Sequence, residues 1–205
     1  MRFNNKVYEA VDLSSIKHDV NVYTNSRTFL EYEYKTPKKG KELWVVLKNP
    51  SKSFYGNVKP SYDVCCIDRT TYNVMKAIDV HNSKTKANKY KKIIIINLFP
   101  EFSTKAKIIN KIYNFSRGNV CLGTCCYRYN HINIVNRLKA KKKNSLDVLF
   151  AWGKNSGINK YAYDIAICEM LSHFVNFDKY EYKNKQIIKN NSLCVHSYPL
   201  HPQRG

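Results

Sequence analysis

Acidic residues are scarce in this sequence: its 205 residues include 15 Asp and Glu against 35 Lys and Arg, for a formal net charge of +20. An excess of this size favours a polyanionic partner, bound through phosphate contacts and counterion release. The 16 tyrosines and 9 phenylalanines suit stacking on bases as well as packing in a core. An AT-rich genome, whose codons favour Lys, Asn, Tyr and Ile, is the alternative explanation. We predict a nucleic-acid partner, with DNA ahead of RNA.

Long apolar runs are absent as well. The longest strongly apolar run, Ile93 to Ile96, is far shorter than the roughly 20 residues that a transmembrane helix needs. The first 19 residues contain no apolar region of the kind found in signal peptides. The sequence therefore predicts a cytoplasmic protein without a membrane partner.

The cysteines lack the pattern of a disulfide framework. There are seven, an odd number that includes two vicinal pairs, which predicts reduced thiols. Cys121, Cys125, Cys126 and His131 are close enough in sequence to suggest zinc, but they lack the paired C-x₂-C spacing of such sites. We expect neither a metal nor another cofactor.

Apolar runs alternate with helical patterns along the chain. Four runs rich in aliphatic residues predict strands buried on both faces, at 43–48, 93–96, 146–151 and 192–195. Helical spacing predicts helices after Asp68, over roughly 125–142 with Ile132, Val135 and Leu138 inward, and over roughly 157–175. Short alternating runs before residue 40 predict antiparallel strands.

This order of elements indicates an α/β fold. The length suits one domain, 1–205, with a core that needs no disulfide or metal for support. We predict a three-layer α/β/α architecture around a central four-stranded, mainly parallel sheet, with a β extension over 1–40.

Polar residues follow the four predicted parallel strands. Asn49 precedes Pro50 after the first strand, Asn97 follows the second, the Trp152-Gly153 turn follows the third, and His196 or His201 follows the fourth. The carboxyl ends of parallel strands meet at one edge of a sheet, where ligands bind. Two amides, an imidazole and a glycine on a basic protein would suit a flat polar ring attached to a phosphate chain.

The order of these motifs resembles the uracil-DNA glycosylase superfamily. The chain is also similar, along nearly its whole length, to an uncharacterised family of bacteria, phages and mobile elements. That family's motifs correspond here to Leu47-Lys48-Asn49-Pro50-Ser51, Asp68-Arg69-Thr70, Asn97-Leu98-Phe99, Ala151-Trp152-Gly153 and His201-Pro202. The resemblance implies a uracil-DNA glycosylase-like fold and a protein of DNA repair or defence that flips a base out of the helix.

The resemblance also implies roles for individual residues. Asn49 would hold the attacking water, and Asn97 would read the Watson–Crick edge of a flipped pyrimidine. A histidine near the end would stabilise the negative charge that develops on the departing base. His201 fits the terminal dipeptide of the uncharacterised family, and His196 fits the spacing of the glycosylase loop, so both stay open with His201 ahead.

Further residues complete the expected site. Phe54 and Tyr55 are the nearest aromatic residues for stacking on the base, and Ser51 stands where the uracil-specific enzymes carry a Tyr that bars the thymine methyl group. Four basic residues are expected to contact the DNA backbone: Lys48, Lys52, Lys154 and Arg204.

Two departures from the glycosylases matter. Leu47 stands where those enzymes usually have Gly, and Asn49 cannot take a proton as a carboxylate can, so hydrolysis would be slow or would need a reactive leaving group. The first hypothesis is therefore a glycosylase-like hydrolase of the N-glycosidic bond. The alternative is a non-catalytic nucleic-acid-binding module of a phage or mobile element with the same fold.

Overall fold

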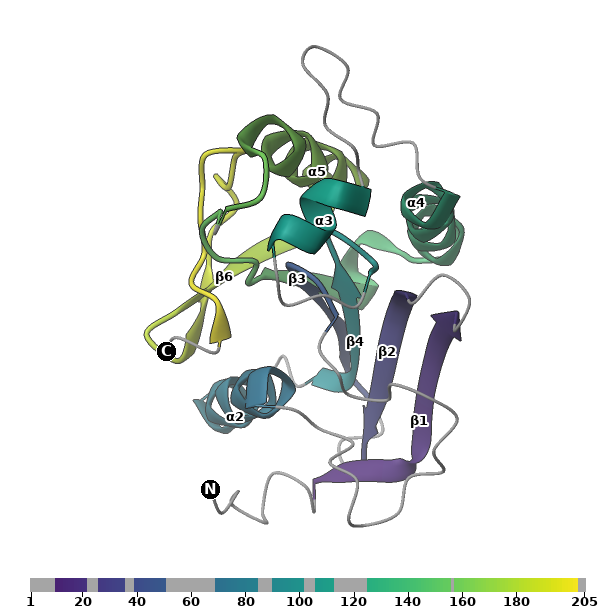
Figure 1. Cartoon of the computed structure of the whole chain (residues 1–205). Coiled ribbons are helices and arrows are strands. Elements are labelled where there is room, and N and C mark those ends of the chain that lie inside the picture. The colour runs from purple at the N-terminus through teal and green to yellow at the C-terminus, as the bar shows by residue number, and fades with distance from the viewer. Residues whose placement is uncertain are drawn as a thin grey trace.

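The computed structural model describes residues 10–21, 26–35, 39–50, 69–84, 90–101, 106–112, 125–155 and 157–202, and structural statements below concern these residues. They form an α/β fold around one mixed sheet of seven strands in the order β1-β2-β4-β3-β5-β6-β7 (Figure 1). The strands are β1 (Val11–Asn21), β2 (Ser26–Tyr34), β3 (Lys41–Leu47), β4 (Tyr90–Asn97), β5 (Leu146–Phe150), β6 (Asp178–Lys183) and β7 (Gln186–Lys189).

The sheet is larger and more mixed than the predicted four-stranded one. The pairs β3–β4, β3–β5 and β5–β6 are parallel, whereas β1–β2, β2–β4 and β6–β7 are antiparallel. The amino-terminal strands are part of this sheet and not a separate extension, because Leu30 of β2 pairs with Ile95 of β4. Most side chains of β2 are buried, so this strand needs cover on both faces.

The predicted strand at 192–195 is wrong. Residues 192–195 form turns and irregular structure, and the fourth parallel strand is β6, in a stretch whose basic character disguised it. Tyr180 and Tyr182 of β6 are 8% and 1% exposed, while their neighbours are charged, so the burial pattern has the period of a strand. Asn184 and Lys185 then take positive φ angles of 50° and 60°, as a tight hairpin to β7 requires.

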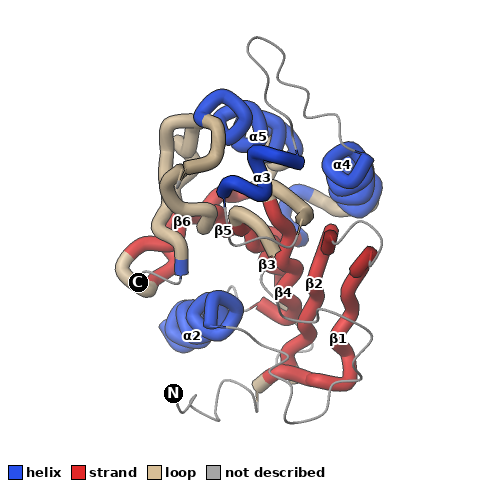
Figure 2. Tube along the Cα trace, in the orientation of Figure 1, coloured by secondary structure: helices blue, strands red, loops and turns tan. Residues whose placement is uncertain are grey.

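Helices cover both faces of the sheet (Figure 2). One face carries α2 (Arg69–Lys84), and the other carries α3 (Ala106–Ile112), α4 (Cys125–Lys139) and α5 (Lys160–His173). The side chains of β3 divide accordingly, because Val45 and Leu47 pack with α2 while Trp44 and Val46 pack with the core of the other face. This alternation later shows which face each site residue occupies.

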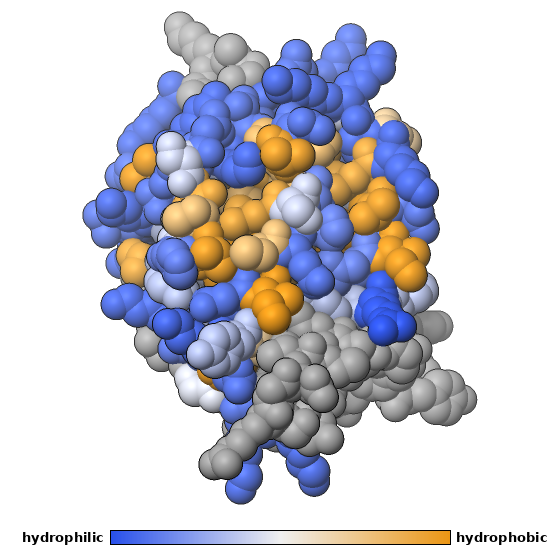
Figure 3. All heavy atoms as spheres, turned by 90° about the horizontal axis from the view of Figure 1, so that it is seen from above, coloured by the Kyte–Doolittle hydropathy of each residue, from blue (hydrophilic) through white to orange (hydrophobic). Residues whose placement is uncertain are grey.

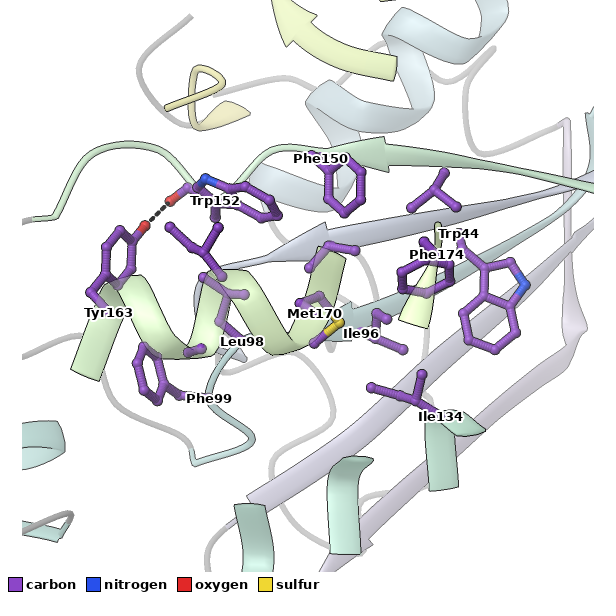
Figure 4. Packing of buried hydrophobic residues seen from close by; sticks show 14 of the residues in the cluster. Trp44, Ile96, Leu98, Phe99, Ile134, Phe150, Trp152, Tyr163, Met170 and Phe174 are labelled. Carbon is purple, nitrogen blue, oxygen red and sulfur yellow. Dashed lines mark hydrogen bonds between the residues drawn. The ribbon is translucent and has the colours of Figure 1, made fainter. Parts of the chain in front are cut away.

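The face between the sheet and α5 holds the aromatic part of the core (Figure 4). The ring of Phe150 lies 4.8 Å from that of Trp152, and the ring of Trp44 lies 5.8 Å from that of Phe174, both in tilted or edge-on arrangements that aromatic rings favour. All four side chains are fully buried. Replacing one of them with Ala would cost about 3–5 kcal/mol, so this core fixes the sheet edge that lies above it.

Of the three residues predicted on the inner face of α4, Leu138 does pack against the core, but Ile132 and Val135 do not belong to that face. Tyr127, Asn130 and Ile134 are 3%, 0% and 2% exposed, whereas the predicted inward residues Ile132 and Val135 are 58% and 36% exposed. The core therefore accepts a tyrosine and an asparagine where apolar spacing had indicated isoleucine and valine.

The other helices agree with the sequence to different degrees. Helix α2 lies where Val74, Met75, Ala77 and Ile78 predicted it, although its expected N-cap, Asp68, lies outside the described residues. The short helix α3 was not predicted.

Hydrophilic residues surround a central group of apolar side chains on the side of the molecule that Figure 3 shows. Among the described residues, the large apolar side chains that are exposed include Tyr161 and Ile165 of α5. No helix among the described residues combines the length and the apolar character needed to cross a bilayer.

Candidate functional site

The carboxyl ends of β3, β4 and β5 are joined by backbone hydrogen bonds. The amides of Leu98 and Phe99 donate to the carbonyls of Leu47 and Lys48 at 2.8 and 2.9 Å. On the other side, the amide of Ala151 donates to the carbonyl of Val46 at 2.9 Å. The turn after β3 therefore lies between the ends of β4 and β5, and Asn49, Asn97 and Gly153 share one edge of the sheet, as the parallel topology predicts.

Asn97 is the most unusual residue at this edge. Its side chain is completely buried at the end of β4, and neither Nδ2 nor Oδ1 has a hydrogen-bond partner among the described residues. Its backbone oxygen accepts a hydrogen bond from Nδ2 of Asn130 at 3.1 Å. Each unsatisfied buried polar group costs about 1–3 kcal/mol, which makes such an amide rare without a functional reason.

The face that Asn97 occupies follows from the alternation along β4. Ile93 and Ile95 pack in the core beneath α2, and Asn97, two residues further on, is in register with them. The donor and acceptor of its amide therefore belong to the α2 side of the carboxyl edge. There they could pair with the edge of a planar ring that carries both a carbonyl and an N–H group.

Asn49 lies in the turn that follows β3. It is half-buried and precedes Pro50, which is buried and fixes the local backbone. From this position, the Asn49 side chain could hold a water molecule at the ends of the strands.

The carboxy-terminal segment brings His201 to the same edge. The amide of Gly153 donates to the carbonyl of Pro199 at 2.9 Å, and Nδ2 of Asn73 in α2 donates to the carbonyl of Pro202 at 2.6 Å. These two bonds hold the segment between the end of β5 and α2. A Cβ atom on Gly153 would stand 2.8 Å from the Cβ atom of His201, so the two residues are in close contact.

The two candidate histidines occupy different environments. His201 is half-buried against Gly153, whereas His196 is exposed in a turn in which the Ser197 amide donates to the Cys194 carbonyl at 2.9 Å. Of the two, the structure brings His201 to the ends of the parallel strands.

Lys48 and Tyr163 tie the turns after β3 and β5 together. Nζ of Lys48 donates to the carbonyl of Lys154 at 2.6 Å and lies 5.5 Å from the centre of the Tyr163 ring. The Tyr163 hydroxyl donates to the carbonyl of Gly153 at 2.7 Å. It also donates to the carbonyl of Trp152 at 3.3 Å (Figure 4). Burial, with smaller contributions from Tyr198 and Asp164, raises the pKa of Tyr163, so the hydroxyl remains a donor.

Five predicted site residues lie outside the described part of the chain, in the segment after Pro50 and at the carboxyl end: Ser51, Lys52, Phe54, Tyr55 and Arg204. Three positioning residues were missed by the sequence reasoning: Asn73, Asn130 and Tyr163. The sequence could have indicated the two asparagines, because Asn is unfavourable inside a helix unless its side chain forms a hydrogen bond there.

Cys121, the first residue of the alternative zinc set, lies outside the described residues. His131 approaches His173, with Nδ1 and Nε2 2.6 Å apart. Within the described ranges, no three His, Cys, Asp or Glu side chains are grouped so that they could hold a metal ion.

A scan against protein-family models, a search of the curated proteins and a search of the solved structures each found no match to this chain. The resemblance to the uracil-DNA glycosylase superfamily rests on the sequence motifs alone.

Proposed function

We propose that this chain binds nucleic acid, DNA in the first place, and takes an extruded pyrimidine or modified base into a site at the carboxyl edge of its parallel strands. The observation that carries the proposal is the fully buried amide of Asn97, neither polar atom of which has a hydrogen-bond partner among the described residues. A base stacked in a duplex cannot reach a buried amide, so the base has to leave the helix first.

Asn97 supplies the means of recognition. A pyrimidine ring presents a carbonyl and an N–H or amino group along one edge, and an amide can answer both. Binding would satisfy the two polar atoms that have no partner among the described residues. A site of this kind rejects a ligand that lacks those groups, because its own polar atoms then stay unpaired.

The positive charge at the same edge supports a phosphate backbone as part of the ligand. Lys48 and the exposed Lys154 belong to neighbouring turns, and the whole chain carries a net charge of +20. Lysines contribute position and affinity through phosphates, while the buried amide would contribute base specificity.

Hydrolysis of the N-glycosidic bond is the activity that this arrangement would serve. Water held by Asn49 would attack C1′ of the extruded nucleotide, the C1′–N bond would break, and its electron pair would leave with the base. His201 would donate a hydrogen bond to the oxygen on which the negative charge develops. The water would lose a proton to solvent and the departing base would take one up, so the products would be the free base and an abasic site.

One observation favours a second candidate function, which is base-dependent binding without cleavage. The described residues to which the proposal assigns a part in the reaction are Asn49, Asn97 and His201, and none of them is a carboxylate. An amide can orient water but cannot accept its proton, which removes a factor of about 10²–10⁴ that general-base catalysis supplies.

The two functions separate in one assay. Oligonucleotides with uracil, a thymine mismatch or a modified pyrimidine are incubated with the protein and then treated with alkali, which cleaves the strand at abasic sites. Strand breaks that Asn97→Ala abolishes and that the matched change Asn144→Ala at an exposed position preserves would support the hydrolase. Base-dependent binding without breaks would support the binding module. Absence of both breaks and DNA binding would overturn the proposal.

A further inference from the structure

A cavity that is open to solvent lies at the opposite edge of the sheet from Asn97, beside the amino ends of β5 and β6. Its volume is about 490 Å³, and it is lined by Val135, Leu138, Lys139, Lys141, Lys143, His173, Asn176 and Phe177. These residues come from the last turns of α4 and α5 and from the connections that lead into the next strands. We call it the lysine cavity. A volume of this size suits a ligand of nucleotide dimensions.

The charge of the lysine cavity is positive. The residues that line it include three lysines and no acidic side chain. Lys141 forms an ion pair with Glu42, with Nζ 2.7 Å from Oε1, whereas the exposed Lys139 donates to the neutral Asn136 amide oxygen at 3.2 Å. Lys143 is exposed in the same segment.

The carboxyl ends of two helices offset part of this positive charge. The carboxyl ends of α4 and α5 each contribute a partial negative charge of about half a unit. Lys139 and Lys143 contribute two full positive charges, and the neighbouring exposed Lys142 adds to the local field. An anion is therefore attracted, with lysine amino groups as its hydrogen-bond donors.

The remaining wall is apolar and aromatic. Val135 is 36% exposed, and Leu138 and Phe177 are only partly covered where they pack against the core. Asn176 adds an amide at the same cavity. His173 contributes little charge near neutral pH, because burial lowers its pKa and its Nε2 is engaged with Nδ1 of His131 at 2.6 Å.

We propose that the lysine cavity binds a nucleoside phosphate, with the phosphate on Lys139 and Lys143 and the base against Leu138 and Phe177. The ligand is either a free nucleotide or a nucleotide unit of a nucleic-acid strand, since both present the same phosphate and base. This site is separate from the one at Asn97, because the two lie at opposite ends of the parallel strands.

Calorimetric titration of the full chain tests the proposal with four probes: dAMP, dTMP, deoxyadenosine and inorganic phosphate. We expect one of the nucleotides to bind more tightly than either the nucleoside or phosphate alone. The double variant Lys139→Glu/Lys143→Glu should weaken nucleotide binding at least about tenfold, since one charged hydrogen bond contributes about 1.5–3 kcal/mol and about 1.4 kcal/mol is a factor of ten.

Two controls identify the site. Lys76→Glu/Lys111→Glu makes the same change in net charge at exposed positions of α2 and α3, and it should leave nucleotide binding unchanged. Asn97→Leu reports any nucleotide that binds at the other site instead, because this change removes the amide proposed to read a base there. An equal loss in the charge control, a loss only in Asn97→Leu, or no nucleotide binding up to about 1 mM would overturn the proposal.

A fifth titration, with a single-stranded oligonucleotide of mixed sequence, identifies the source of the ligand. If the strand competes with the nucleotide and loses affinity in Lys139→Glu/Lys143→Glu, the cavity binds a unit of the strand. If the nucleotide alone is affected, the cavity binds a free nucleotide. Thermal unfolding of each variant shows whether it is folded.

Discussion

Gly153 and His201 are packed so closely that a Cβ atom on Gly153 would stand 2.8 Å from the Cβ atom of His201. Gly153 also has a φ of +72°, which side chains other than hydrogen rarely allow. The glycine therefore does two things at once: it turns the chain after β5, and it leaves room for the histidine at the carboxyl edge.

Gly153→Ala is expected to displace His201 and to destabilise the fold. The backbone strain alone should lower the free energy of unfolding by about 1–3 kcal/mol. Gly157→Ala is the matched control, because Gly157 has a φ of +86° but an added Cβ would meet only the Ala106 methyl at 3.4 Å. Urea unfolding and DNA binding of both variants check this. Equal loss of base-dependent binding in the two would contradict the role of the Gly153–His201 contact.

His201→Gln is expected to reduce base excision, or base-dependent binding, far more than His196→Gln. Removing a donor from a developing oxyanion slows a reaction by about 10²–10³. His196 is exposed, so its replacement should leave both stability and activity near the values of the unmodified protein. The abasic-site assay with both variants makes the comparison. A larger effect at His196 would reverse the assignment.

DNA affinity is expected to fall steeply between about 50 and 200 mM salt. Lys48→Met should lower the slope of log affinity against log salt by about one, as the loss of one phosphate contact does. The same change at Lys76, an exposed lysine of α2, is the control and should leave the slope unchanged. Fluorescence anisotropy with a labelled duplex measures the slopes. Affinity that does not depend on salt would contradict phosphate binding at this edge.

Stability is expected to decline as the pH falls from about 6.5 towards 4. Burial and the neighbouring His173 lower the pKa of His131 to about 4, so between these values the unfolded chain binds a proton that the folded chain does not. His131→Gln should reduce this decline.

Burial raises the pKa of Asp79 to about 6, which makes stability change with pH in the opposite direction. The variant and the unmodified protein are therefore compared with each other at each pH. Urea unfolding at pH 7 and pH 5 supplies the values. A pH dependence that survives unchanged in His131→Gln would show that another group causes it.

The sequence predicted the central strands because their residues are apolar throughout. Val45 and Ile95 belong to strands covered by helices on both faces, and such strands are continuous aliphatic runs. The parallel order then placed Asn49, Asn97 and Gly153 at one edge. Strand β6 was missed for the converse reason, because charged residues separate Tyr180 and Tyr182.

The details of the site depended on tertiary packing. The Asn97 position could be predicted. Its complete burial and its lack of a side-chain partner within the described ranges could not, since both depend on the elements around β4. The position of His201 at this edge likewise depends on the hydrogen bond from Asn73 to the carbonyl of Pro202, which joins residues 129 apart in the chain.

Asn97→Leu is expected to make the protein more stable while it loses the proposed function. Leucine has a similar volume and removes two buried polar atoms that lack partners among the described residues, so the free energy of unfolding should rise by about 1–3 kcal/mol. Natural sites often show this opposition between stability and activity. Urea unfolding checks it, and a decrease would indicate that the amide is satisfied in solution.

The most direct test of the account is one ratio: the affinity for a duplex with a mismatched pyrimidine, divided by the affinity for the same duplex with a stable abasic analogue at that position. The account predicts that the unmodified protein prefers the base at least about tenfold, which is about 1.4 kcal/mol. In Asn97→Leu the ratio should be close to one, while salt-sensitive binding persists. A ratio near one in the unmodified protein, or an unchanged ratio in Asn97→Leu, would contradict base recognition by Asn97.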